Sequence, residues 1–146
     1  MKQSSNIIKL TYTLKTISPI ARNFYRKLKK GDTVLLCGNL GVGKTTFVKY
    51  LISTMGVCIH DVTSPTFNLV NIYNTSVMKI WHFDLYRTNN QFELINIGLF
   101  ETRDQGVTII EWGDIGQKLL PRYSFKLNLY FCGHEGGRII TIKKNI

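Results

Sequence analysis

The sequence lacks the long apolar runs and the secretory leader that would place a protein in a membrane or outside the cell. No apolar run approaches the roughly 18 residues that a membrane-spanning helix needs. The first ten residues, MKQSSNIIKL, contain neither an apolar core nor the small-residue cleavage site of a signal peptide. We therefore expect a cytoplasmic protein that does not enter a membrane.

Cysteine is also scarce, and its placement excludes two common kinds of site. The three cysteines, Cys37, Cys58 and Cys132, are odd in number and form no CxxC pair. A disulfide framework or a zinc site is therefore not expected, and the cysteines are interpreted as small apolar residues. The three histidines show no ligand spacing either.

Acidic residues are few, which gives the chain a strong positive charge. The chain has nine Asp and Glu and 19 Lys and Arg, which gives a net charge of +10. The electrostatic field of so positive a protein favours polyanionic partners. The densest basic run, RNFYRKLKK at residues 22–30, fits either the solvated face of a helix or a patch that meets RNA or an acidic protein. No aromatic RNA-reading strand accompanies it, so charge alone does not identify a nucleic-acid-binding protein.

The length and element pattern predict one domain over residues 1–146. No repeat or Pro/Gly/Ser-rich linker divides the 146 residues, and 44% of them are hydrophobic. Thr16 is expected to cap a first helix, and Gly31 to follow its end. The patterns predict helices at 17–29, 44–54 and 89–98, buried strands at 33–37 and 107–112, a hairpin of 64–73 with 77–83, and closing strands at 124–131 and 138–142.

The stretch GNLGVGKTT, residues 38–46, matches the phosphate-binding pattern G-x-x-x-x-G-K-[ST]. Its glycines let the backbone curl so that several N–H groups point at one anion, and the following helix adds its positive end. Lys44 would reach the β and γ phosphates, and the Thr45 hydroxyl would bind Mg²⁺. The predicted ligands are a nucleoside triphosphate and Mg²⁺, and the phosphate-binding residues besides Lys44 and Thr45 are Gly38, Asn39, Leu40, Gly41, Val42, Gly43 and Thr46.

Four further residues are candidates for the chemistry. A P-loop needs a carboxylate on the magnesium side at the end of a neighbouring strand, and both Asp84 and Glu111 close apolar runs. One is expected to face the metal and the other to position water, and spacing does not assign these roles. Thr66 belongs either to a segment that senses the γ-phosphate or to an ordinary turn. Trp112 is either a core residue or an aromatic wall beside the nucleotide.

Four blocks resemble the TsaE (YjeE) family in order and spacing: GNLGVGKTTF, SPTFNLVNIY, HFDLYR and IIEWGD, within residues 16 to about 114. The resemblance implies an α/β fold, a P-loop NTPase-like three-layer sandwich with a mixed, partly antiparallel sheet. It also implies a small bacterial ATPase that works with TsaB and TsaD to form threonylcarbamoyladenosine at position 37 of tRNA. ATP hydrolysis would reset the complex, and contact with tRNA would be indirect.

The resemblance implies the same site residues. Lys44 and Thr45 would bind phosphates and Mg²⁺, Asp84 and Glu111 would form the acidic pair, Thr66 would lie in a switch-like segment, and Trp112 would lie near the nucleotide. Three residues depart from the family pattern, which usually has Asp where Asn39 stands and often EWPE where this chain has EWGD, with Gly113 and Asp114. We expect Gly113, in place of proline, to loosen the turn after Trp112.

Three other functions remain open from the sequence. A small-molecule kinase usually carries an arginine-bearing lid, but the six arginines do not cluster in a long insertion. A GTPase usually carries an N-K-x-D stretch, which is absent. A non-catalytic RNA-binding module would use the positive charge and keep the glycine loop as a structural element.

Overall fold

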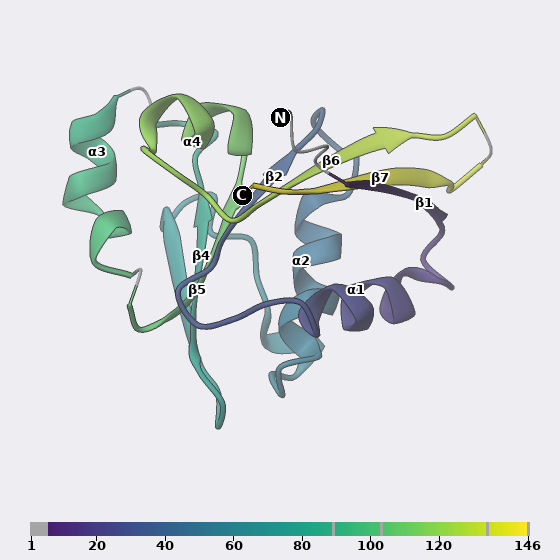
Figure 1. Cartoon of the computed structure of the whole chain (residues 1–146), viewed down its shortest axis with the longest axis horizontal. Helices are drawn as coiled ribbons and strands as arrows, with labels where there is room; N and C mark the ends of the chain where they lie inside the picture. The colour runs from purple at the N-terminus through teal and green to yellow at the C-terminus, as the bar shows by residue number, and fades with distance from the viewer. Residues whose placement is uncertain (1–5, 89, 103, 134, 146) are drawn as a thin grey trace.

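The computed structural model describes residues 6–88, 90–102, 104–133 and 135–145, and a seven-stranded mixed sheet forms its centre (Figure 1). The strand order is β1-β7-β6-β2-β5-β4-β3. The strands are β1 (Ile7–Tyr12), β2 (Thr33–Cys37), β3 (Val70–Asn74), β4 (Lys79–Asp84), β5 (Gly106–Glu111), β6 (Phe125–Phe131) and β7 (Arg138–Lys144). The helices are α1 (Ile17–Tyr25), α2 (Lys44–Ser53), α3 (Gln91–Asn96) and α4 (Gly113–Leu119), with 3₁₀ turns at Ile59–Asp61 and Leu99–Thr102.

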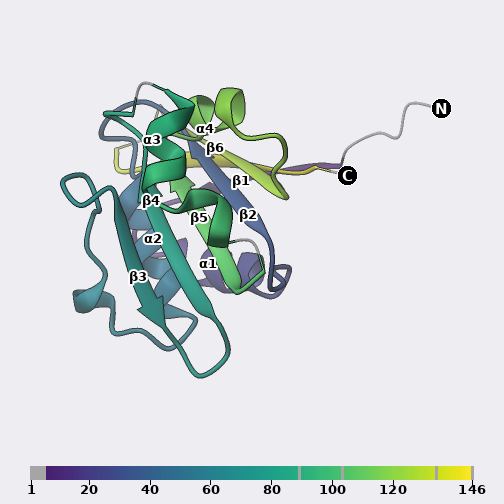
Figure 2. The same cartoon turned by 90° about the vertical axis from the view of Figure 1, so that its left-hand side faces the viewer.

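The sheet combines a parallel centre with antiparallel flanks. β2 pairs in parallel with β5 and β6, and β4 with β5, whereas β1–β7, β6–β7 and β3–β4 are antiparallel. β1 and β3 form the two edges of the sheet (Figure 2). Because the four parallel strands share one direction, their carboxyl ends meet at one edge, where the connecting loops can form a site.

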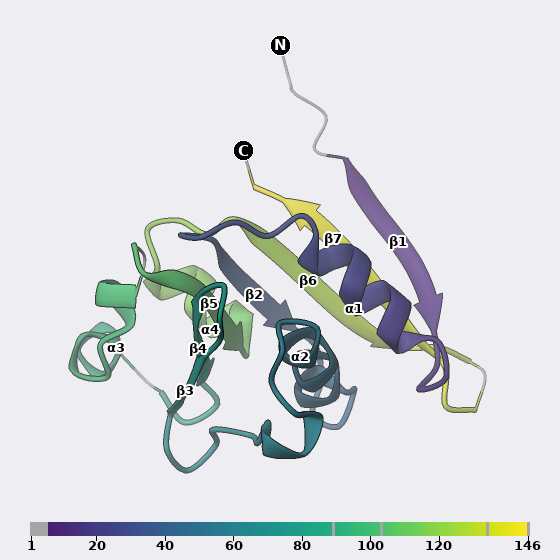
Figure 3. The same cartoon turned by 90° about the horizontal axis from the view of Figure 1, so that it is seen from below.

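Helices cover both faces of the parallel centre, which gives three layers. α1 and α2 lie on one side of the sheet, and α3 and α4 lie on the other (Figure 3). All five residues of β2 are buried, since Val34 and Leu36 pack into the core beneath α1 and α2, while Leu35 and Cys37 pack into the opposite core. The expectation of a three-layer α/β sandwich with a mixed sheet is confirmed, and the apolar run at 33–37 reflects burial on both faces.

Two elements have no counterpart among the predictions. β1 is an edge strand in which only Tyr12 is buried. Its residues 8–12 alternate between apolar and polar side chains, a strand pattern that the predictions did not use. α4 contains two of its chain's glycines, Gly113 and Gly116, which are poor helix formers. Its position is therefore determined by packing against β2 and not by local propensity.

Several predicted boundaries were wrong. α1 ends at Tyr25, and residues 26–28 continue as hydrogen-bonded turns in which Leu28 is still buried. Thr16 does not cap α1 through its side chain, because its hydroxyl bonds to the backbone of Thr13. Gly31 does adopt the left-handed conformation, with φ of 95°.

The remaining elements differ from expectation mainly at their starts. Residues 66–69 form turns, so β3 begins only at Val70, and Leu69 has a positive φ of 64°. α3 begins at Gln91, and the side chain of Asn90 caps it by accepting the Glu93 N–H. The predicted start of that helix at Asn89 lies outside the described residues. No described helix has the length and apolarity required to cross a bilayer.

Candidate functional site

The loop between β2 and α2, residues 38–43, forms the centre of the candidate site. Gly38, Gly41 and Gly43 all have positive φ, of 146°, 76° and 107°. A Cβ at Gly38 would lie 2.7 Å from the Leu129 carbonyl oxygen and 2.9 Å from Val42 Cγ1, so this position accepts only glycine without displacing the backbone. No side chain caps the start of α2, which leaves the backbone N–H groups of its first turn able to bind an anion.

Lys44 places a positive charge inside this loop. Its side chain is buried, and Nζ donates to the carbonyl oxygens of Gly38 at 2.6 Å and Asn39 at 3.1 Å. Nζ also lies 3.9 Å from the centroid of the Trp112 ring. Burial lowers the pKa of Lys44, while the nearby carboxylates of Glu111 and Asp84 act in the opposite direction.

Glu111, the last residue of β5, is hydrogen-bonded to α2. The Thr45 hydroxyl donates to Glu111 Oε2 at 2.8 Å, and the imidazole of His82 lies with Nε2 2.8 Å from Oε1. Glu111 is only 2% exposed, so both carboxylate oxygens are held in a nearly buried environment. Such charge-assisted bonds are among the stronger ones in proteins.

Asp84 lies opposite Glu111 on the neighbouring strand but has different partners. The two residues are in register between β4 and β5. Asp84 Oδ2 accepts from the Thr66 hydroxyl at 3.0 Å, and Oδ1 accepts from the Tyr86 N–H at 2.9 Å. Thr66 in turn lies 2.7 Å from the Ser64 hydroxyl. Glu111 is therefore hydrogen-bonded to Thr45 of the loop–helix motif, whereas Asp84 is hydrogen-bonded to Thr66 in the segment before β3.

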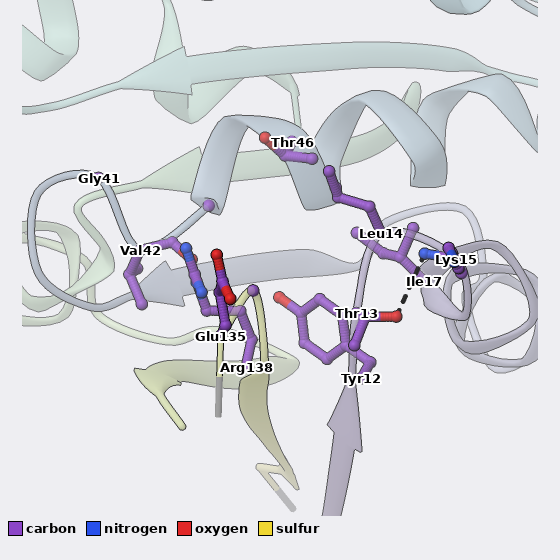
Figure 4. Close-up of a pocket in the computed structure, with 12 residues that line it drawn as sticks. Tyr12, Thr13, Leu14, Lys15, Ile17, Gly41, Val42, Thr46, Glu135 and Arg138 are labelled. Atoms are coloured by element: carbon purple, nitrogen blue, oxygen red, sulfur yellow. Dashed lines mark hydrogen bonds between the residues drawn. The ribbon is translucent and has the colours of Figure 1, made fainter. Parts of the chain in front are cut away.

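Of the cavities beside the loop, two share Gly41, Gly43 and Thr46. The first, of about 330 Å³, is lined by Leu40, Gly41, Gly43, Lys44, Thr45, Thr46, Ser64, Thr66, Asp84, Tyr86, Glu111 and Trp112. The second, of about 520 Å³, lies toward β1 and β7, and Figure 4 shows Tyr12, Glu135 and Arg138 beside the loop there. Arg138 Nε donates to the Val42 carbonyl at 2.8 Å, so β7 also supports the loop.

Aromatic residues form one wall of the first cavity. The rings of Tyr86 and Trp112 lie 4.8 Å apart, and Trp112 has a left-handed backbone with φ of 58°. This conformation turns the chain from the end of β5 into α4. Gly113 is buried, and a Cβ there would lie 2.7 Å from Leu35 Cβ, so glycine at this position permits α4 to pack tightly on β2. That Gly113 loosens the turn relative to proline stays a prediction.

Most predicted residues gather at the first cavity, but three loop residues do not line it. Val42 is fully buried beneath the loop, and Gly38 and Asn39 contribute carbonyl oxygens to Lys44. Reasoning from the sequence missed His82, Ser64 and Tyr86. The position of His82, two residues before Asp84, could have indicated it, because alternate residues of a strand point to the same face.

The donors present suit Mg²⁺ better than a softer metal. Thr45 and Glu111 offer oxygen atoms, which Mg²⁺ prefers, and Mg²⁺ usually takes only one or two protein ligands besides phosphates and waters. Among the described residues, no group of three His, Cys, Asp or Glu is arranged to hold a metal. Burial, with a contribution from Asp114, raises the pKa of Cys37 to about 12, so its thiol stays protonated and is not a metal ligand.

Comparisons with known proteins agree on one family. A family model described as "Threonylcarbamoyl adenosine biosynthesis protein TsaE" matches residues 11–139. The chain is 36% identical to tRNA threonylcarbamoyladenosine biosynthesis protein TsaE of Rickettsia typhi over 124 residues, covering 85% of each chain. It is 33% identical to the Bacillus subtilis protein of the same name, over 83% of this chain and 78% of that one. The crystal structure of Bacillus subtilis YdiB is similar, with a TM-score of 0.77 and 28% identity, over 98% of this chain and 88% of that one.

Proposed function

The chain belongs to the TsaE family of tRNA threonylcarbamoyladenosine biosynthesis proteins, and from this premise we propose that it is a cytoplasmic, Mg²⁺-dependent ATPase. Its hydrolysis of ATP would reset a complex of TsaB and TsaD homologues between cycles of tRNA modification, with tRNA contacted through those partners. One observation carries the proposal: Lys44, Thr45 and Glu111 converge on one cavity beside a glycine loop, and the bonded pair Asp84 and Thr66 lines the same cavity.

The phosphates would lie in the first cavity. The Lys44 ammonium and the uncapped start of α2 supply positive charge where the β and γ phosphates would bind. Thr45 and Glu111 are the residues that would hold Mg²⁺. When bound, the ion would neutralise phosphate charge as it develops in the transition state.

The nucleoside would occupy the second cavity. Phosphates bound at Gly43 and Thr46 would direct the rest of ATP toward this space, since both residues line both cavities. Burial raises the pKa of Tyr12 to about 12, so its hydroxyl remains a hydrogen-bond donor there. Arg138 adds a positive charge on the same side.

Asp84 is the candidate for water positioning, because its partner Thr66 belongs to the segment that precedes β3. Phe67 in this segment is 84% exposed and has Arg87 5.1 Å from its ring. A segment with so exposed an apolar residue is suited to rearrange when the γ-phosphate or a partner protein binds. We therefore expect slow hydrolysis by the chain alone and faster hydrolysis with its partners.

The test is ATP hydrolysis measured with and without TsaB and TsaD homologues. Lys44→Ala should reduce the rate by about 100-fold or more, because one charge that stabilises the transition state is lost. Lys49→Ala, on the same helix but outside both cavities, should leave the rate unchanged. A near-normal rate for Lys44→Ala contradicts the phosphate role of the loop, and equal rates with and without partners contradict the resetting role.

The same assay distinguishes the other functions. Phosphate release without an added acceptor argues against a kinase, and competition between ATP and GTP identifies the base. The net charge of +10 is the observation that favours the alternative of an RNA-binding module. Steeply salt-dependent tRNA binding by the isolated chain, without ATP, would favour that function over the proposed one.

A further inference from the structure

His82 is a fully buried histidine that lies behind the candidate site. It is in β4, has an exposed fraction of 0%, and does not line the first cavity. Ile80 belongs to the core under α2, so His82 and Asp84 point to this same face of β4. His82 therefore lies beneath the site without reaching the space that a nucleotide would occupy.

Among the described residues, the imidazole of His82 has one hydrogen bond, and it goes to a carboxylate of that site. His82 Nε2 lies 2.8 Å from Glu111 Oε1. For Glu111 to accept this bond as a carboxylate, the proton must be on Nε2. The other oxygen, Oε2, accepts from the Thr45 hydroxyl at 2.8 Å, so the two bonds together fix both oxygens of Glu111.

The other ring nitrogen of His82, Nδ1, makes no hydrogen bond with the described residues. Nδ1 is one of two buried polar side-chain atoms in the described residues that lack a hydrogen-bond partner, the other being Thr88 Oγ1. A buried unpaired nitrogen is unfavourable, so a histidine is a poor choice if the position only needs to be filled. The bond from Nε2 is the feature that an apolar side chain of similar volume could not supply.

We propose that His82 is a positioning residue: it holds the Glu111 carboxylate so that Oε2 faces Thr45, and thereby sets the affinity of the site for Mg²⁺. The proposal rests on the proposed function, because it requires the metal to bind beside Thr45 and Glu111. Hydrogen-bond partners of metal-ligating carboxylates orient those carboxylates in this manner, and the loss of such a partner commonly lowers metal affinity by about 10–100-fold.

Two amide variants separate positioning from packing. The side-chain nitrogen of glutamine reaches about where Nε2 lies, whereas that of asparagine reaches only to the position of Nδ1. His82→Gln therefore keeps a donor for Glu111, and His82→Asn does not. Thr88→Val is the control, because it changes the other unpartnered buried side chain outside the site.

The measurement is ADP binding by calorimetry, in Mg²⁺ and in EDTA, which requires no hydrolysis. We expect His82→Asn to reduce the Mg²⁺-dependent gain in ADP affinity by about 10-fold or more. Affinity in EDTA should stay the same, and His82→Gln and Thr88→Val should both remain within about threefold of the original protein. An unchanged Mg²⁺-dependent gain in His82→Asn, or equal losses in both amide variants, overturns the proposal. If the original protein binds ADP equally with and without Mg²⁺, the proposed metal site itself is wrong.

A second measurement needs no substitution at His82 and so does not depend on whether those variants fold. In the ¹⁵N spectrum of the unaltered protein, the imidazole of His82 should carry a slowly exchanging proton on Nε2, bonded to Glu111. Glu111→Gln should shift that resonance, because the carboxylate that accepts the proton is gone. An Nε2 without a proton, or a resonance indifferent to Glu111→Gln, contradicts the positioning role.

Discussion

Gly113 offers a quantitative test of how closely α4 packs on the sheet. A Cβ at this position would lie 2.7 Å from Leu35 Cβ, 2.9 Å from Cys37 Sγ and 3.1 Å from the Leu36 nitrogen. Two of these three atoms belong to or adjoin the backbone of β2, so they cannot move aside as a flexible side chain would. Gly113→Ala should therefore destabilise the protein by about 1–3 kcal/mol, the usual range for inserting one carbon into a packed core.

A matched control lies three residues later in the same helix. A Cβ at Gly116 would meet its nearest neighbours at 3.4–3.5 Å, which is ordinary van der Waals contact. Gly116→Ala also gains up to about 1 kcal/mol from the higher helix propensity of alanine. Its stability should therefore equal or exceed that of the original protein, although the chemical change is identical.

The assay is thermal unfolding followed by circular dichroism. For a chain of this length, the expected destabilisation of Gly113→Ala corresponds to a fall in Tm of about 3–10 °C. The displaced helix start should also move the neighbouring Trp112 ring relative to Lys44, so we expect a changed tryptophan fluorescence and weaker ATP binding. Equal Tm values for Gly113→Ala and Gly116→Ala would refute the packing argument.

Three further predictions follow, two for the site and one for the buried cysteine of β2. Glu111→Gln should reduce the Mg²⁺-dependent part of ATP affinity, measured by calorimetry. Asp84→Asn should preserve ATP binding and slow hydrolysis, measured as phosphate release, by about 100-fold. If Asp84→Asn instead loses the Mg²⁺-dependent affinity and Glu111→Gln keeps it, the two roles are exchanged. Burial lowers the pKa of Lys44, so its charge is lost at a lower pH than that of an ordinary lysine. As the pH rises, kcat/KM for ATP should therefore fall at a lower pH than the titration of an ordinary lysine would give. Lys44→Arg should remove that fall, because arginine stays charged. Iodoacetamide at pH 8 should modify the exposed Cys58 in the folded protein. Cys37 should react only after unfolding, because burial raises its pKa to about 12. If mass spectrometry shows that Cys37 and Cys58 are alkylated at equal rates in the folded protein, the burial of Cys37 is contradicted.

The sequence by itself determined the local parts of this protein. The pattern of GNLGVGKTT predicts a phosphate-binding loop, because its glycines, its lysine and its threonine each have a local function in such a loop. The buried strands at 33–37 and 107–112 were predicted because a strand covered on both faces must be apolar throughout. Family membership followed from motif order alone and was confirmed.

Only the tertiary structure decided how those parts meet. The order of β4 and β5 in the sheet places Asp84 beside Glu111, and the direction of α2 places Thr45 on Glu111 alone. The bond from His82 likewise depends on neighbouring strands: alternation along β4 places His82 on the same face as Asp84, but only the pairing of β4 with β5 brings it to Glu111, 29 positions away. Partners of this kind are selected by geometry across elements, which the one-dimensional spacing of residues does not contain.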